Sequence, residues 1–445
     1  MKTILSPAAC CILLFTLVFS QVSWAQYDSA FNAFADQAEE EFESFEARNQ
    51  KLFNDFVKKN DEAFTNLLRK AWSDQQVLLG IDPPDEPKPK DVPTIEPMDV
   101  DQDEPEEIPV DVPEKEPQAE KKKKETEKPT IPPIQKEEPD DFDKNTIQFG
   151  FYGQQIKLKV DKAISPSLGS LDNEAIANAF EQLAGTNHYH LINQIRAEQH
   201  NMNLNDWGYY LLTKKAAGEI TSTTRDARLL TWFLMVKSRY KMKVAYNSNK
   251  LFLLLPSRNM MYGRPYFTID GGKYFVLDEK YTGNVKTYQG QYPDAQMQVN
   301  FDIRKAPSLP ATTSATKNLS FTYKGQDYSF PVKYNQQVID FYQDYPLVEV
   351  KVYFDAVLSP TAKDALLKEF GPMLQGKSEL EAVSLLLKFA QTAFAYKTDD
   401  DQFGREKFFF PEELFHFPYS DCEDRSVIFA YLVRELLNLE VVGLG

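Results

Sequence analysis

The chain has 445 residues, enough for two or three domains that each bury a hydrophobic core. Its net charge is −16, but residues 82–140 alone hold 20 Asp and Glu against 9 Lys and Arg, or −11. The acidity therefore belongs to one segment, and no basic stripe predicts nucleic-acid binding. Three cysteines and four histidines without metal-ligand spacing exclude a typical zinc site, and we expect no metal and no cofactor.

Residues 1–25 are predicted to be a secretory signal peptide. Lys2 gives a positive start, residues 9–20 are apolar, and Ser23-Trp24-Ala25 is a small-x-small cleavage motif. The apolar run is too short to span a membrane. We therefore expect an exported protein, periplasmic or extracellular, with no membrane span in the mature chain. The alternative is an uncleaved anchor.

Residues 26–76 are expected to form one long helix. An 11-residue period makes three helical turns at 3.67 residues per turn, so that one stripe stays on one face. The stripe is narrow, which favours self-association through residues 28–75 or another partner over a solitary helix. The alternative is that the helix lies on its own globular part. The repeat runs through three series: Phe31, Phe42, Phe53 and Phe64; Phe34, Phe45, Phe56 and Leu67; and Ala38, Asn49, Asn60 and Ala71.

Residues 77–144 are expected to be a disordered linker. Fourteen of the 27 prolines fall between residues 81 and 141, among Asp, Glu and Lys. Such a segment cannot bury enough apolar area to fold, and it should stay extended, in part as polyproline II.

Residues 145–295 are predicted to form an α+β domain. Alternating apolar residues on both sides of Gly153 indicate a hairpin, and Asp270-Gly271-Gly272 indicates a second one. The remaining patterns are helical at 173–213 and 226–239, and strand-like at 251–255, 266–269 and 274–277. We expect His188, His190 and His200 to be surface or capping residues rather than ligands.

Residues 296–356 alternate like strands at 299–303, 319–323, 328–330 and 348–352, which predicts a β-rich unit. The period then becomes helical in residues 357–445. Ser359 and Pro360 are typical of a helix start, and Ser378 with Glu381 indicates a capping box. The Asp399–Asp401 run lacks the spacing of a calcium loop and is expected to be solvated.

Cys422 is the candidate nucleophile, and it is the only cysteine outside the predicted signal peptide. Ser420 or Asp421 would be the N-cap of an apolar helix that starts at Cys422. Helix-start N–H groups stabilise a thiolate and can donate to an oxyanion. Glu423 and Asp424 oppose the thiolate, so a histidine is needed to take the proton. The alternative is an inert buried cysteine.

The string from Ser420 to Ser426, behind a helix and a loop, resembles the transglutaminase-like (papain-like) cysteine superfamily, especially its bacterial exported members. The likeness covers residues 375–445. It implies a Cys-His-Asp triad with Cys422 as nucleophile, Tyr419 as an oxyanion or polar support, and a protein or peptide substrate. No histidine follows Cys422, although 440–445 would begin the next strand, so we expect a C-terminally truncated domain. His416 is a weak candidate for the base.

A second, weaker likeness to the same superfamily lies upstream. Thr224-Arg225-Asp226 opens an apolar helix, and strands follow it up to Asp278, which would occupy the aspartate position. Thr224 or Arg225 stands where the cysteine is needed. The segment is interpreted as a degenerate, non-catalytic copy of the core or as an unrelated α+β domain.

Together these observations predict an α+β protein. An incomplete transglutaminase-like core would follow a small β unit and an upstream α+β domain, behind a long helix and a disordered linker. The predicted function is an exported cysteine enzyme that cleaves or transfers an amide or peptide acyl group through a thioester. The alternative is a non-catalytic assembly or binding protein that uses the 11-residue-repeat helix.

Overall fold

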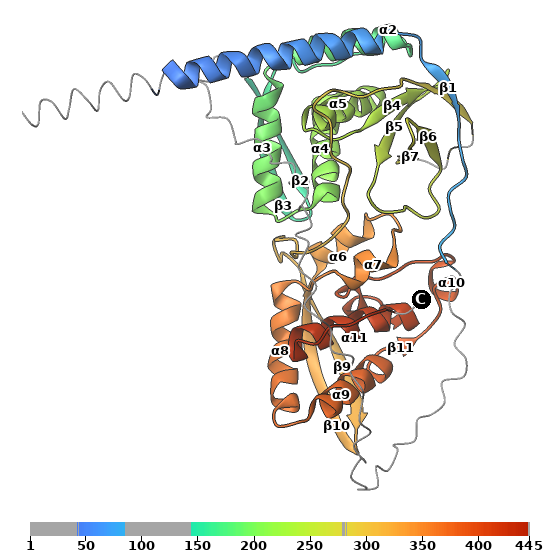
Figure 1. Cartoon of the computed structure of the whole chain (residues 1–445). Coiled ribbons are helices and arrows are strands. Elements are labelled where there is room, and N and C mark those ends of the chain that lie inside the picture. The colour runs from blue at the N-terminus through green and yellow to red at the C-terminus, as the bar shows by residue number, and fades with distance from the viewer. Residues whose placement is uncertain (1–41, 43, 85–143, 278–280, 282, 444–445) are drawn as a thin grey trace, which may run out of the picture. The chain divides into compact units, whose positions relative to one another are not determined.

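The computed structural model describes residues 42, 44–84, 144–277, 281 and 283–443 (Figure 1). The predicted signal peptide, residues 26–41 and 43 of the predicted helix, most of the predicted linker and Asp278 lie outside these residues. The chain divides into two compact units, Met1–Ala63 and Phe64–Gly445. In the described part of the chain, none of the helices has the length and apolar character that crossing a membrane requires.

The first unit contributes the beginning of a helix that runs through residues 44–68. Its large apolar side chains include four that are more than half exposed: Phe42 (58%), Phe45 (55%), Leu52 (67%) and Phe56 (54%). The helix ends eight residues before the predicted boundary, because residues Ser73–Gln76 form strand β1 instead.

The second unit begins with the last part of the 11-residue repeat, which is buried. Phe64 is 1% exposed, and its ring centroid lies 5.0 Å from that of Phe180 and 5.6 Å from that of Tyr288. Leu68 and Trp72 are buried in the same core. Next to them, Arg69 contacts acidic side chains of helix α2 (Asn173–Ala184). This part of the repeat therefore packs on its own globular unit.

One six-stranded antiparallel sheet organises the upstream domain, in the order β1-β8-β4-β5-β7-β6. Strands β1 and β6 are the two edges of this sheet. Leu78, two residues after β1, pairs with Tyr266 of β6, so the two edges meet and the sheet nearly closes. A Cβ on Gly80 would lie 2.6 Å from the backbone nitrogen of Arg264, so only glycine fits there. The predicted linker therefore begins later than residue 77. The strands beyond β1 are β4 (Lys243–Tyr246), β5 (Leu251–Pro256), β6 (Tyr266–Ile269), β7 (Gly272–Val276) and β8 (Asn284–Thr287).

Helices and a hairpin complete this domain. Strands β2 (Lys144–Phe151) and β3 (Gln154–Asp161) form the predicted hairpin, with Ile147 opposite Leu158. Helices α3 (His188–Asn201), α4 (Asp206–Ile220) and α5 (Thr224–Lys237) follow α2. The prediction of surface or capping histidines was wrong for His188, which is 2% exposed and stacks edge-on against Phe233.

The β-rich unit predicted at 296–356 is only partly present. Strands β9 (Ser314–Tyr323) and β10 (Gln326–Asn335) form a hairpin, but residues 299–303 hold no strand. Helices α6 (Gln336–Gln343) and α7 (Val350–Phe354) follow the hairpin. Alternating valines favour a strand, but Val352 and Tyr353 are buried side by side in α7, and tertiary packing overrides that preference.

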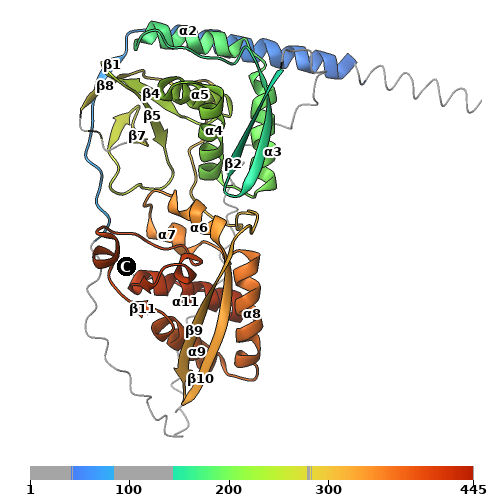
Figure 2. The same ribbon diagram turned by 180° about the vertical axis from the view of Figure 1, so that it is seen from behind.

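The C-terminal part has its own core. Helix α8 (Pro360–Leu374) packs on β10, α9 (Glu379–Thr392) packs on β9, and α11 (Cys422–Leu437) packs on α9 (Figure 2). The strand predicted at 440–445 is absent from the described residues up to Gly443. The short elements between α9 and α11 are β11 (Ala395–Tyr396), α10 (Asp399–Phe403), the 3-10 helix η1 (Glu413–Phe415) and β12 (Tyr419–Ser420).

A buried carboxylate ties these elements together. Glu412 is fully buried and accepts hydrogen bonds from the N–H of Asn335 at the end of β10 (3.1 Å) and of Ser359 before α8 (2.8 Å). The Ser359 hydroxyl donates a third, also at 2.8 Å. Burial raises the pKa of Glu412.

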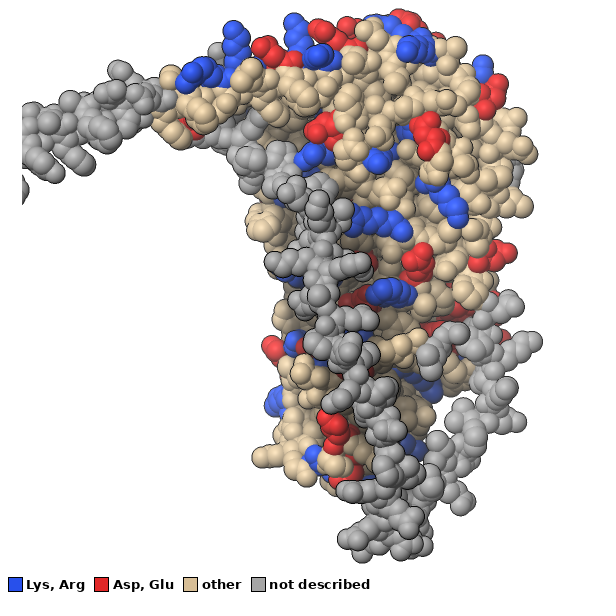
Figure 3. Space-filling model, viewed as in Figure 1, with Lys and Arg blue, Asp and Glu red and all other residues tan. Residues whose placement is uncertain are grey.

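On the face that Figure 3 shows, acidic and basic side chains are interspersed over the described surface.

Replacing Phe64 with alanine should lower the free energy of unfolding by about 3–5 kcal/mol, because a fully packed ring leaves a cavity. The matched variant Phe42→Ala removes the same side chain from the same series of the repeat, at a site that is 58% exposed. It should change stability by no more than about 0.5 kcal/mol. Urea unfolding of both variants checks this, and equal losses would contradict it.

Candidate functional site

The start of α11 presents Cys422. Asp421 is the N-cap: its side chain accepts from the N–H of Asp424, whose side chain accepts from the Asp421 N–H in return. Cys422 is therefore the first helical residue, and of the two predicted N-caps the structure selects Asp421. Buried apolar residues of α11, among them Val427 and Ile428, anchor the helix in the cores beneath.

Two short strands and one arginine fix the chain just before the helix. Strands β11 and β12 pair in parallel, with Tyr396 opposite Ser420. Arg425 donates to the Ser420 hydroxyl (3.2 Å), to the Gln391 carbonyl (2.9 Å) and to the Phe394 carbonyl (2.7 Å). The end of α9 and the start of α11 are thus held together around Cys422.

The Cys422 thiol is half-buried, and its pKa is raised above the ordinary value. Burial is the largest cause, followed by the negative charge of Glu423. A hydrogen bond with Tyr396 and the charge of Arg425 act in the opposite direction. This direction is opposite to the lowering that a helix start by itself would give.

Tyr396 interacts with the thiol, and Tyr419 precedes Cys422 by three residues in the chain. Tyr419, the predicted polar support, is 41% exposed, and its ring centroid lies 5.5 Å from the Lys397 Nζ atom. Tyr396, which hydrogen-bonds with Cys422, is 42% exposed. Sequence reasoning missed Tyr396, since a two-residue strand leaves no periodic pattern to detect.

Three buried carboxylates lie behind the helix start. Oxygen atoms of Asp399, Asp421 and Asp424 lie within 4.8 Å of one another. Asp399 was expected in a solvated loop, but it is 2% exposed and begins α10. Capping by Asp421 and Asp424 has a sequence signature, whereas the burial of Asp399 does not. Among the residues that the structure describes, these three have the donor chemistry and the spacing to hold a hard cation.

Backbone groups already use these carboxylates. Asp424 accepts from the Phe409 N–H at 2.9 Å, and Asp399 accepts from the Lys407 N–H at 2.6 Å. Burial and the charges of Asp421 and Asp399 raise the pKa of Asp424 well above its ordinary value. These hydrogen bonds join the loop before α11 to the start of the helix.

His416, the weak candidate base, sits in a different environment. Its Nδ1 atom lies 3.4 Å from the Tyr334 hydroxyl, and its ring packs edge-on against Phe417. Burial lowers its pKa, against the charges of Glu413 and Asp340, which raise it. The contacts that define its position are those with Tyr334 and Phe417, whereas the Cys422 thiol has Tyr396 as its hydrogen-bond partner.

Helix α5 begins in the same way as α11. Its N-cap Thr223 accepts from the N–H of Asp226, the third helical residue, as Asp421 accepts from Asp424. Asp226 in turn accepts from the N–H of Leu168 at 3.0 Å, as Asp424 accepts from Phe409. Thr224 is the first helical residue, so it occupies the place that Cys422 has in α11, and Arg225 follows it.

Comparison with known proteins gives no assignment: no family model, no curated protein and no solved structure matches the chain.

Asp399→Asn should lower the pKa of Asp424, because it removes one of the charges that raise it. Asparagine keeps an oxygen for the Lys407 N–H. A raised carboxyl pKa contributes stability below about pH 4 that is lost as the pH rises through the folded-state pKa. As the pH rises above 4, the free energy of unfolding of the variant should therefore fall by less than that of the wild type.

Carboxyl titration by carbon NMR and urea unfolding between pH 4 and 8 measure both effects. Asp400→Asn is the control, since Asp400 is the exposed neighbour in α10. An Asp424 pKa that is the same in both variants would refute the coupling.

Proposed function

We propose that Cys422 is the nucleophile of an exported, transglutaminase-like cysteine enzyme that acts on amide or peptide bonds. The observation that supports the proposal is the placement of Cys422 as the first residue of a capped helix, half-buried at the protein surface. The N–H groups of Cys422 and of Glu423 take no part in the hydrogen bonds of the helix itself, and a helix start can donate such groups to an oxyanion.

The proposed chemistry has two steps. In the first, the Cys422 sulfur attacks the carbonyl carbon, the amide C–N bond breaks, and the thiol proton leaves with the amine. In the second, water or another amine attacks the thioester, releases a carboxylate or a new amide, and returns the proton to the sulfur. The sequence likeness supports both outcomes equally.

The surroundings of the thiol set a requirement on this chemistry. Because the pKa of Cys422 is raised, the sulfur is protonated at neutral pH and a base must remove its proton. Tyr396 and Arg425 favour the thiolate, and Glu423 opposes it. The reactivity of the thiol should therefore respond in opposite directions to changes at these neighbours.

Glu423→Gln should lower the pKa of Cys422 and speed its alkylation by iodoacetamide at pH 7, and Tyr396→Phe should raise the pKa and slow alkylation. The rate against pH measures both. Hydrolysis of a fluorogenic peptide, and incorporation of a fluorescent amine into casein, should follow the same order and should be abolished in Cys422→Ala.

Glu379→Gln, which makes the same change in the first turn of α9, is the control for these variants. Peptide hydrolysis or amine incorporation that survives in Cys422→Ala would refute the nucleophile. If alkylation responds as expected but neither reaction occurs with any variant, Cys422 is a structural cysteine and the proposal fails.

A second candidate function is assembly through the N-terminal helix. The exposed Phe42, Phe45 and Phe56 belong to the 11-residue repeat, and a surface stripe of phenylalanine is typical of a protein interface. A partner with the same period, such as a second copy of the chain, could keep the stripe covered along its length.

Phe42→Ser, Phe45→Ser and Phe56→Ser combined should therefore shift the chain towards the monomer in sedimentation velocity at micromolar concentration. The control is Leu380→Ser, which removes an apolar side chain that is 76% exposed on α9. A wild-type chain that sediments as a monomer up to about 100 μM would exclude self-association, since that concentration corresponds to about 5–6 kcal/mol of binding free energy.

We further propose that the domain around α5 is a degenerate copy of the same core. The matching helix starts, with an N-cap and a buried Asp at the third helical position, support this proposal. Thr224 would replace the nucleophile, so this copy would bind without catalysing.

A further inference from the structure

Arg425 bridges three segments of the chain that meet beside Cys422. It is the fourth residue of α11, three positions after Cys422, and it is half-buried. Each of its side-chain nitrogens donates a hydrogen bond: Nε to the Ser420 hydroxyl, Nη1 to the Gln391 carbonyl and Nη2 to the Phe394 carbonyl. These acceptors belong to β12, to the last turn of α9 and to the residue just before β11.

The strand that carries Tyr396 depends on these contacts. Strand β11 has two residues, and its pairing with β12 places Tyr396 opposite Ser420. A strand pair of this length has too few hydrogen bonds to be stable by itself. Arg425 supplies what the pair lacks, because it holds Phe394 just before β11 and Ser420 within β12. The position of Tyr396 therefore follows from that of Arg425.

Tyr396 links the guanidinium to the thiol. The guanidinium carbon of Arg425 lies 5.2 Å from the centroid of the Tyr396 ring, a stacking contact that favours one orientation of the ring. The side chain of Tyr396 hydrogen-bonds with Cys422 and lowers its pKa, and the charge of Arg425 acts in the same direction by less. The larger of these two effects on the thiol thus belongs to the residue that Arg425 holds.

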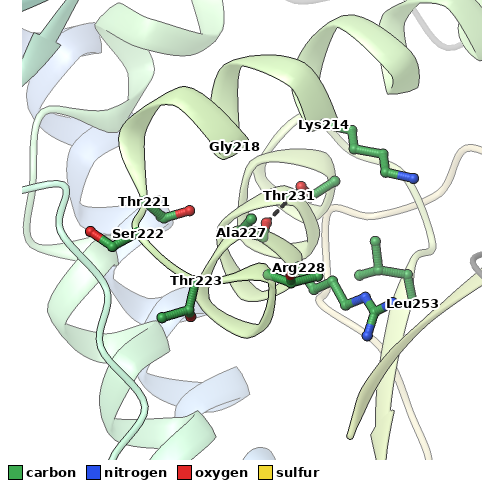
Figure 4. Close-up of a pocket in the computed structure, with 10 residues that line it drawn as sticks. Lys214, Gly218, Thr221, Ser222, Thr223, Ala227, Arg228, Thr231 and Leu253 are labelled. Carbon is green, nitrogen blue, oxygen red and sulfur yellow. Dashed lines mark hydrogen bonds between the residues drawn. The ribbon is translucent and has the colours of Figure 1, made fainter.

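The start of α5 lacks this arginine. When α5 and α11 are aligned at their first residues, Ala227 takes the place of Arg425. Figure 4 shows Ala227 beside a hollow of about 440 Å³ between the end of α4 and the start of α5. In α11 the guanidinium of Arg425 joins the helix start to the end of α9 instead. Of these two helix starts, the one that carries the cysteine is the one with the clamp.

We propose that Arg425 is the positioning residue of the Cys422 site: it holds Tyr396 against the sulfur, and the Tyr396 hydroxyl donates the hydrogen bond that stabilises the thiolate. This inference rests on the proposed enzymatic function, because it names the residue that prepares the nucleophile for that reaction. Arginine suits the role, since its planar fork reaches three acceptors in fixed directions, whereas lysine has a single ammonium on a flexible stem. A change to lysine therefore keeps the charge and loses the geometry.

The test measures the alkylation of Cys422 by iodoacetamide against pH, in the chain from residue 26 onward, where Cys422 is the only cysteine. Tyr396→Phe and Arg425→Lys should each lower the rate at pH 8 about threefold. Losing a hydrogen bond to the thiolate raises the thiol pKa by about one unit, and the greater nucleophilicity of a more basic thiolate restores part of the rate. The double variant should be no slower than Tyr396→Phe alone, because Arg425 then has no donor left to position.

Arg434→Lys is the matched control, since Arg434 lies on the same helix and donates to the Phe354 carbonyl, and it should leave the rate unchanged. Ser420→Ala removes one acceptor of the clamp and serves if Arg425→Lys does not fold. It should slow alkylation in the wild-type background and not in Tyr396→Phe.

Three outcomes would overturn the positioning role: an unchanged rate in folded Arg425→Lys, losses that add in the double variant, or an equal loss in Arg434→Lys. Peptide hydrolysis and amine incorporation are measured on the same samples. If both are absent from the wild type while the alkylation rates behave as expected, the enzymatic function fails and the positioning of Tyr396 by Arg425 stands.

Discussion

Glu412 is the point on which the C-terminal part of the molecule depends. A fully buried carboxylate is costly unless its oxygens are satisfied, and here two backbone N–H groups and one hydroxyl satisfy them. Those donors belong to the end of β10 and the cap of α8, which lie 24 residues apart, between Asn335 and Ser359. The next residue, Glu413, is also buried and pairs with Lys407 at 2.7 Å. The two adjacent glutamates at the start of η1 therefore fix the position of the loop before α11.

The sequence predicted features that local chemistry decides. The β2–β3 hairpin, the cap of α8 at Ser359 and the helix start at Cys422 follow from alternation, capping residues and period. It could not predict features that depend on distant partners. Residues Val350–Phe354 form a helix because of their packing. Asp399 is buried by contacts with the loop and with α11. Residues 64–72 lie in the core because Phe64 packs against Phe180 and Tyr288.

The chemistry around Cys422 shows how capping and reactivity compete. Acidic residues at a helix start improve its hydrogen bonding and its dipole energy, but the same charges raise the pKa of a thiol beside them. In α5 the equivalent place holds Thr224, which has no such conflict. The helix start is thus built for stability in both places, and any reactivity at Cys422 must be gained against that background.

Strand β1 has a consequence for the order in which the chain folds. Ser73 of β1 pairs with Thr287 of β8. The two strands lie on opposite sides of the proline-rich segment in the sequence, so β1 can join the sheet only after β8 has been made. Closing so long a loop costs entropy that no local contact returns. During synthesis the N-terminal segment emerges first and the strand that receives it emerges last, so the upstream sheet cannot be completed until most of the domain has left the ribosome.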